Sequence, residues 1–332
     1  LIYLANDISK EAYDDRQEVD DILESVQKSI FGITQDRLKK GFEKIDPVLH
    51  ETFERIDMIA SHKGSVIGVP SGFSDLDVKT TGFQKGDLII IAGRPGMGKT
   101  SFALNMMRNA AIDSNKKIGF FSLEMANNQL AMRLLCAEAR VDSNLVRAGN
   151  LPKSQYKNLS LAVGPLSNAD IYLDDTPALS ILELRAKARR LKNDVDADMI
   201  IVDYLQLMQG PSGLESRQQE IATISRSMKA LAKELNVPIV ALSQLSRAVE
   251  QRTGSKRPQL SDLRESGAIE QDADVVLFLF RPWVYSREDE DEGKAEIIIA
   301  KQRNGPTGIV EATYINRYTR FENLAHNPET PF

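Results

Sequence analysis

The segment from Gly93 to Thr100, Gly-Arg-Pro-Gly-Met-Gly-Lys-Thr, constrains the fold more than any other part of the chain. It has the full spacing of a P-loop, in which backbone N–H groups surround the phosphates of a nucleotide. An apolar run at 87–92 precedes it and a helical stretch at 101–107 follows it, and this strand, loop and helix are the context that the motif requires. The chain is therefore predicted to bind a nucleoside triphosphate, ATP, through Gly93, Arg94, Pro95, Gly96, Met97, Gly98, Lys99, Thr100 and Ser101.

Two ligands for Mg²⁺ can be assigned from the same chemistry. Lys99 is expected to reach the outer phosphates, while the hydroxyl of Thr100 binds the metal. A second ligand should be an acid at the end of another strand, and the apolar run Met199-Ile200-Ile201-Val202 ends in Asp203. The sequence therefore predicts that Thr100 and Asp203 hold Mg²⁺ between them.

The general base that activates the attacking water must come from a third segment. Many ATPases place a glutamate directly after the metal-binding acid, but here that residue is Tyr204. Glu124 follows the apolar run 117–123, and the carboxyl ends of strands are where parallel sheets gather their ligand-binding groups. We expect Glu124 to be the base; the alternative is an acid that caps the next helix or lies in solvent.

The rest of the chain alternates apolar runs with helical patterns. Apolar runs occur at Ile171–Leu173, Pro238–Leu242, Val275–Phe280 and Ile297–Ala300, with helical stretches at Ser180–Lys192 and Glu215–Leu235. This alternation predicts an α/β fold with a mostly parallel, twisted sheet and helices on both faces. The later runs, Glu296–Lys301 and Val310–Ile315, flank the turn Asn304-Gly305-Pro306 and are expected to form an antiparallel hairpin at one end of the sheet.

The first 60 residues differ in kind from the rest. Residues 1–15 are interpreted as the remnant of an upstream helical domain, 16–60 as a linker helix and connector, and 61–332 as one ATPase domain. Val19, Ile22, Leu23, Val26 and Ile30 form a single apolar stripe at helical spacing. This stripe must be buried either on its own domain or on a neighbouring copy, and the residues alone do not decide between the two. No run has the length or character of a membrane span or a secretion signal.

Positive charge is concentrated locally in a chain whose net charge is −5. A stretch that contains Gly and Ser carries four cations after a predicted strand end: Arg247, Arg252, Lys256 and Arg257. Such a stretch can follow a phosphate backbone, although an ordinary solvated loop is the alternative. Arg264 follows shortly afterwards, just before a predicted helix, where it is also expected to meet a phosphate.

These motifs together carry a close resemblance to the bacterial DnaB-like replicative DNA helicases of the RecA-like superfamily. The resemblance covers nearly the whole length. It lies in the P-loop and in five further segments: 121–125 (Phe-Ser-Leu-Glu-Met), 202–207 (Val-Asp-Tyr-Leu-Gln-Leu), 241–247 (Ala-Leu-Ser-Gln-Leu-Ser-Arg), 262–274 and 300–306 (Ala-Lys-Gln-Arg-Asn-Gly-Pro).

The resemblance implies roles for particular side chains. Glu124 would be the catalytic base, and Gln244 would sense the γ-phosphate and relay its presence to DNA. Lys301 and Arg303, which lie two residues apart at an exposed strand end with no acid beside them in sequence, would reach into the ATP site of the neighbouring subunit. Arg264, Glu265 and Gly267 would lie on a loop in the central channel and contact the single strand.

The resemblance also implies an assembly and its surroundings. A homo-hexameric ring would translocate on single-stranded DNA, with its six sites firing in sequence, and unwind forked duplex DNA in the cytoplasm, at the replication fork in the nucleoid. The linker helix would pack on the adjacent subunit. Primase, a helicase loader and other replisome proteins are the implied partners, and primase contact is in doubt because the family's helical N-terminal domain is almost wholly missing here. Two alternatives stay open: a RecA-like recombinase filament, and an ATP-dependent ring scaffold or loader.

Overall fold

The computed structural model describes residues 44–61, 66–210 and 216–324, and the chain divides into two compact units between residues 63 and 64. The first unit contains α3 (Ile45–Ser61), a helix that lies mostly within 16–60, the range interpreted from the sequence as a linker helix and connector. The expected remnant at 1–15 and the apolar stripe from Val19 to Ile30 lie outside the described residues. No helix within the described ranges is both long and apolar enough to cross a membrane.

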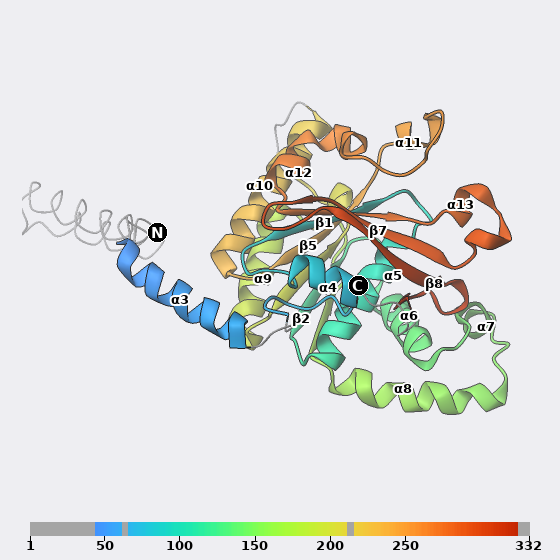
Figure 1. Ribbon diagram of the computed structural model, residues 1–332. Helices are drawn as coiled ribbons and strands as arrows, with labels where there is room; N and C mark the ends of the chain where they lie inside the picture. The colour runs from blue at the N-terminus through green and yellow to red at the C-terminus, as the bar shows by residue number, and fades with distance from the viewer. Residues whose placement is uncertain (1–43, 62–65, 211–215, 325–332) are drawn as a thin grey trace, which may run out of the picture. The chain divides into compact units, whose positions relative to one another are not determined.

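The second unit is built on one nine-stranded sheet with the order β3-β2-β4-β5-β1-β6-β7-β8-β9 (Figure 1). The first six strands in this order are parallel, and the last three are antiparallel, so the predicted hairpin is confirmed and a third strand extends it. The strands are β1 (Leu88–Gly93), β2 (Ile118–Ser122), β3 (Ile171–Asp174), β4 (Met199–Asp203), β5 (Ile239–Gln244), β6 (Val275–Phe280), β7 (Lys294–Gln302), β8 (Gly308–Ile315) and β9 (Arg320–Asn323).

Helices cover both faces of this sheet, as the alternating pattern predicted (Figure 1). One face is covered mainly by α9 (Ile181–Val195), α10 (Arg217–Leu235) and α12 (Gly267–Asp272), and the other by α4 (Ser74–Thr80), α5 (Lys99–Arg108) and α6 (Asn127–Ala139). The remaining helices are α7 (Ser143–Arg147), α8 (Tyr156–Asn168), α11 (Ala248–Gln251) and α13 (Trp283–Ser286).

The central strand β1 belongs to two hydrophobic cores at once. Successive side chains of a strand point to opposite faces, and here Ile89 and Ile91 enter the core beneath α5, whereas Leu88 and Ile90 enter the core beneath α10. Every residue of β1 is buried. This explains the uninterrupted apolar run in the sequence, because a strand covered on both faces has no polar side.

Aromatic packing holds the P-loop helix α5 against the sheet's antiparallel end. The ring of Phe102 stacks on Phe73 at 4.8 Å between centroids and meets the edge of Phe321 at 5.3 Å. Phe321 lies on β9, and its backbone N–H donates to Asn105 Oδ1 at 2.6 Å. The strand that the sequence did not predict therefore secures the helix that begins with Lys99.

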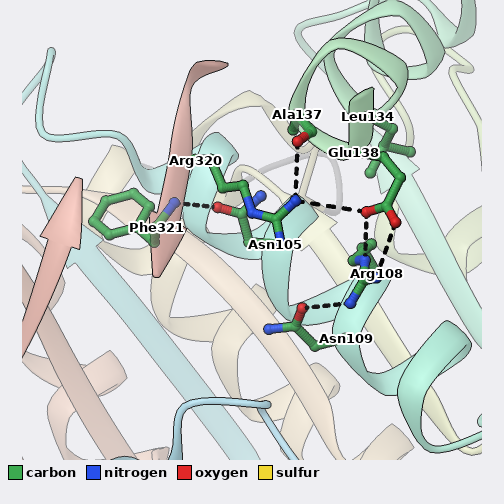
Figure 2. A pocket seen from close by; sticks show the side chains of 8 residues that line it. All are labelled: Asn105, Arg108, Asn109, Leu134, Ala137, Glu138, Arg320 and Phe321. Carbon is green, nitrogen blue, oxygen red and sulfur yellow. Dashed lines mark hydrogen bonds and ion pairs between the residues drawn. The ribbon is translucent and has the colours of Figure 1, made fainter. Parts of the chain in front are cut away.

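The far end of α5 is fixed by charged groups around a small polar pocket (Figure 2). Arg108 donates to both carboxylate oxygens of Glu138 on α6, at 2.7 and 3.0 Å. Arg320 approaches the same carboxylate at 3.6 Å and donates to the carbonyl of Ala137 at 2.9 Å. The helix after the P-loop is thus joined to the helix that follows Glu124.

Truncation of Phe102 should cause a large loss of stability. The side chain is fully buried between two other rings, so we expect Phe102→Ala to lower the free energy of unfolding by about 3–5 kcal/mol. Val78 on α4 is 79% exposed, and Val78→Ala should change the same free energy by less than about 0.5 kcal/mol. Urea unfolding of the two variants and the wild type measures both; equal effects would contradict the assigned core.

Candidate functional site

The P-loop leaves the carboxyl end of β1 at Gly93 and enters α5 at Lys99. Gly96 and Gly98 have φ values of 81° and 89°, a region that residues with a Cβ atom rarely adopt. A Cβ atom on Gly98 would also lie 3.1 Å from the ring of Phe321. The loop therefore requires glycine at position 98 for both its backbone conformation and its packing.

Lys99, Thr100 and Asp203 meet at the carboxyl edge of the sheet. Lys99 Nζ donates to the carbonyl of Gly93 at 3.0 Å, and Thr100 Oγ1 donates to Asp203 Oδ2 at 2.7 Å. Asp203 is the last residue of β4 and is 1% exposed. The hydroxyl and the carboxylate predicted to share a metal ion are thus in direct contact.

The electrostatics of this group follow from its burial. Burial raises the pKa of Asp203 to about 6, and the negative charge of Glu124 acts in the same direction, against the hydrogen bond from Thr100. Burial also lowers the pKa of Lys99, although the charges of Asp203 and Glu124 oppose the shift. A buried carboxylate with an elevated pKa gains stability when a cation binds it, so the site favours binding of a positive ion.

Glu124 stands in the turn after β2, beside this group. β2 pairs with β4 so that Ser122 is the register partner of Asp203. Ser122 Oγ orders the turn, because it donates to the carbonyl of Met125 at 2.6 Å and accepts from the Met125 N–H at 3.1 Å. Glu124 is exposed, and its role as the base stays a prediction.

Two arginines connect the P-loop to the rest of the domain, one from outside the loop and one from within it, and the sequence indicated neither contact. Arg281, just after β6, donates to the carbonyl of Gly96 at 2.9 Å and lies over the ring of Tyr314 at 3.9 Å. Arg94, although part of the P-loop, directs its guanidinium at Leu245 and Glu250. The contribution of Arg94 to a phosphate site would thus come from its backbone.

Gln206 fastens the strand end that carries Gln244. Its Nε2 donates to Ser243 Oγ at 2.9 Å and to the Gln244 carbonyl at 3.2 Å, while its Oε1 accepts from the Gln244 N–H at 3.2 Å. The side chain of Gln244 is itself exposed at the end of β5. Sequence reasoning missed this positioning residue, because a glutamine three residues beyond Asp203 gives no signal of its partner.

Three of the four cations in the predicted basic stretch form hydrogen bonds or ion pairs with other parts of the chain. Arg252 forms an ion pair with Asp262, and Lys256 Nζ donates to the carbonyl of Glu250 at 2.9 Å. Arg257 binds both carboxylate oxygens of Glu296 at 2.8 and 2.6 Å. Three of the four cations thus have a partner within the folded chain, and their contact with DNA stays a prediction.

The remaining predicted DNA contacts are placed by their backbone. Arg247 is exposed and directly precedes α11. Arg264 and Glu265 lie in a short 3-10 helix, η4 (Leu260–Ser266), and Gly267 begins α12. The side chains from Arg264 to Gly267 lie outside the described part of the structure, and their contact with DNA stays a prediction.

Lys301 and Arg303 lie toward the amino ends of the parallel strands, whereas the P-loop lies at their carboxyl ends. β7 is antiparallel to β6, and Lys301 pairs with Val276, near the start of β6. β6 lies parallel to β1, with Val276 level with Ile90. Along the strand direction, about 10 Å therefore separates Lys301 from the start of the P-loop of its own chain, and about 16 Å separates Arg303 from it, and both cations also lie two strands away from β1.

Arg303 is exposed, as expected, but Lys301 is not, and an acid that is distant in sequence, Asp274, lies near Arg303. Lys301 is partly buried, and its Nζ donates to the carbonyl of Ala273 at 2.8 Å and to that of Glu270. Arg303 donates to the carbonyl of Gln271 at 3.0 Å and approaches Asp274 Oδ1 at 3.5 Å. Both cations thus cover the carboxyl end of α12, where helix carbonyls attract positive charge.

Comparison with known proteins identifies the family. Residues 68–323 match the model of the DnaB-like helicase C-terminal domain. The chain is 48% identical to the replicative DNA helicase DnaB of Geobacillus stearothermophilus and 48% identical to the replicative DNA helicase DnaC of Bacillus subtilis, over 98% of this chain and 71% of each relative. The chain belongs to the DnaB-like helicase family.

Solved structures agree with this assignment. One, described as an ATPase domain, superposes with a TM-score of 0.81 at 39% identity and covers 86% of this chain and 100% of the other. A DnaB-like replicative helicase, described with its interactions with primase, gives a TM-score of 0.82 at 36% identity, over 98% of this chain and 75% of the other.

These findings establish the fold and the activity. The sheet is that of a RecA-like ATPase domain, and the chain is a replicative DNA helicase, an enzyme whose nucleotide hydrolysis drives DNA unwinding. Family membership also supports the resemblance derived from the motifs over the rival hypotheses of a recombinase filament and a scaffold.

One charged group near Arg303 makes the stability of this DnaB-like domain depend on pH. Burial, together with the nearby Asp274 carboxylate, raises the pKa of Asp87 from 3.8 to about 6, against the effects of Lys229 and Arg303. Between these two pKa values the native state binds more protons than the unfolded chain, so this group's contribution to stability falls as the pH rises, and it levels off above about pH 6.

We therefore expect Asp87→Asn to remove this part of the pH dependence. The free energy of unfolding of the wild type, minus that of the variant, should fall as the pH is raised from about 4 to about 6. Urea titrations across this range measure the difference. Asp194 on α9 is 59% exposed, and Asp194→Asn is the matched control; a difference for Asp87→Asn that rises with pH would contradict the assigned environment.

Proposed function

We propose that this domain binds ATP with Mg²⁺ at the P-loop and hydrolyses it with Glu124 as the general base. The observation that carries the proposal is the meeting of Lys99, Thr100 and Asp203 at the carboxyl edge of the sheet, with Glu124 in the adjacent turn. Lys99 would neutralise charge on the outer phosphates, and Glu124 would accept the proton of the attacking water.

The residues present fit Mg²⁺. Thr100 and Asp203 offer one hydroxyl and one carboxylate oxygen, and Mg²⁺ is usually held by one or two protein oxygen ligands together with phosphates and water. Within the residues that the structure describes, no group of three or more His, Cys, Asp or Glu side chains is arranged to hold a metal ion. When bound, the metal supplies positive charge to the phosphate oxygens.

We further propose that Arg303, with Lys301 beside it, completes the ATP site of a neighbouring subunit. Both cations lie two strands away from β1 and about 10 to 16 Å from their own P-loop along the strand direction, farther than an arginine side chain reaches. A second copy must therefore bring its P-loop to them, as in a closed ring of six subunits. In the present fold they are held at the carboxyl end of α12, so engagement with a neighbour would replace these contacts.

The DNA-binding side of the proposal rests on segments between β5 and β6. Gln244, fastened at the end of β5, would sense the γ-phosphate, and the stretch after it would face the single strand through Arg247, Arg264, Glu265 and Gly267. Arg252, Lys256 and Arg257 would contribute mainly by shaping this stretch, since each has an internal partner.

The assembly would act at a replication fork on single-stranded and forked DNA. One structural neighbour is described with its interactions with primase, and by analogy primase, a helicase loader and other replisome proteins are the proposed partners of the full assembly. Unwinding of a forked duplex by the purified protein, in the presence of ATP, tests the activity directly, and a scaffold or loader would leave the fork intact.

Glu124→Gln should separate nucleotide binding from hydrolysis. An amide cannot accept the proton of the attacking water, and loss of a general base typically costs about 10²- to 10⁴-fold in rate. Nucleotide affinity should be retained because Lys99 and the P-loop backbone are intact. Steady-state turnover and equilibrium binding of a fluorescent ATP analogue measure the two properties. Normal turnover in this variant would show that the base lies elsewhere.

Mixed rings test whether Arg303 acts in a neighbouring subunit. Arg303→Ala should lower turnover by roughly 10³- to 10⁵-fold, the usual effect of losing an arginine finger, and leave nucleotide binding nearly unchanged. Lys99→Ala subunits lack a working P-loop but retain the finger, so mixing the two variants should restore some turnover that neither has alone. If no activity returns although subunit exchange is proven, the shared site is refuted.

A further inference from the structure

The P-loop has one side chain that joins it to a segment beyond the nucleotide site. Arg94 donates through Nη1 to the Leu245 carbonyl at 2.7 Å and through Nε to Glu250 Oε1 at 2.9 Å, and its Nη2 lies 2.7 Å from the same oxygen. The Arg94 side chain is only 7% exposed, whereas that of Glu250 is 48% exposed. The ion pair therefore has a buried end in the P-loop and an accessible end on α11.

Glu250 belongs to a segment, residues 245–263, that has several hydrogen bonds and an ion pair between its own residues. Lys256 Nζ donates to the Glu250 carbonyl, and Arg252 pairs with Asp262. Asp262 is buried, accepts from the Gln259 N–H at 2.7 Å through its side chain, and accepts from the Ser246 N–H at 3.2 Å through its carbonyl. We call this stretch the β5–η4 segment (245–263) and expect that a displacement of Lys256 would reach Glu250 through their direct contact.

The chemistry of the pair makes this transmission stiff. A guanidinium that has lost its water needs a partner, and loss of that partner leaves a buried charge unpaired. The planar fork of arginine also fixes direction as well as distance, which a lysine would not do. When Glu250 moves, the Arg94 side chain and the P-loop backbone between Gly93 and Gly96 are therefore expected to move with it.

We infer that Arg94 is a positioning residue that couples the nucleotide to DNA, through its ion pair with Glu250. The inference rests on the proposed function, in which the β5–η4 segment faces the single strand. It adds a connection distinct from Gln244: Gln244 would sense the γ-phosphate from the end of β5, whereas Arg94 ties the first half of the P-loop to α11.

A purely structural anchor and a coupling residue predict different measurements. An anchor would weaken nucleotide binding whether or not DNA is present. A coupling residue would leave the binding of each ligand alone nearly unchanged and reduce the effect of one ligand on the affinity for the other, and this mutual effect must be equal in both directions.

The test uses the assembled protein with oligo-dT and a non-hydrolysable ATP analogue. The affinity for oligo-dT is measured with and without the analogue, and the affinity for the analogue with and without oligo-dT. Glu250→Gln replaces a half-exposed acid by a neutral amide of the same shape. In this variant, the ratio of the oligo-dT affinity with the analogue to that without it should move toward one by about 5-fold or more. Each affinity measured alone should stay near the wild-type value.

Glu234→Gln provides the matched control. Glu234 is also a partly exposed acid that pairs with arginines, Arg185 and Arg189, but it lies on α10 and makes no contact with the P-loop or the β5–η4 segment among the described interactions. In Glu234→Gln, the ratio of the oligo-dT affinity with the analogue to that without it should equal the wild-type ratio.

A double variant tests whether the two residues act through each other. If the pair carries the coupling, Arg94→Met combined with Glu250→Gln should have the same ratio as Arg94→Met alone. A wild-type ratio in Glu250→Gln, or nucleotide affinity that falls without DNA in proportion to the ratio, would overturn the inference. A wild type that shows no DNA binding would instead refute the proposed function, so the two failures are distinguishable.

Discussion

Burial of β1 between two hydrophobic layers is the constraint on which the site depends. Its six residues are inaccessible to solvent from both faces and are held by β5 on one side and β6 on the other. A strand fixed in this way leaves its last residue, Gly93, in one position, and the P-loop is built outward from that point. The register with β5 also places Gln244 beside Gly93, so the phosphate loop and the proposed sensor are aligned by the same backbone ladder.

Beyond Gly93, side chains from other parts of the fold hold the P-loop in its conformation. The loop buries Met97 in the core, and its shape is further secured by Arg281 on the Gly96 carbonyl, by Arg94 on Glu250, and by the aromatic ring beneath Gly98. These partners come from different parts of the fold: Arg281 follows β6, Glu250 lies on α11 and Phe321 lies on β9. Because a charged hydrogen bond that is shielded from water is costly to break on one side only, the loop is sensitive to small movements of elements that never touch the nucleotide.

The sequence was sufficient for features that depend on local pattern and insufficient for those that depend on distant partners. Most strand positions, the P-loop and the acid at the end of β4 could be predicted because an apolar run ending in a polar residue is visible within a few positions. The segment from Ile45 to Ser61 forms a helix that the sequence analysis placed between a linker helix and the ATPase domain without assigning its structure. The pairings of Arg94 with Glu250 and of Arg257 with Glu296 join residues far apart in sequence, and only the folded chain reveals them.

Strand direction explains why the two parts of the proposed catalytic machinery lie at opposite ends of the strands of one sheet. Parallel strands direct all of their carboxyl ends to a single edge, which collects Lys99, Asp203 and Glu124, whereas the antiparallel β7 returns its own carboxyl end, with Arg303, to the other edge. No movement within such a sheet can bring the two together without breaking its ladder. A chain built in this way has half of the proposed shared site at each edge, and α12 connects the edge bearing Arg303 to the segment proposed to face DNA. Attachment of each proposed finger to the carboxyl end of α12 would give the ring a physical route by which DNA in one subunit bears on hydrolysis in the next.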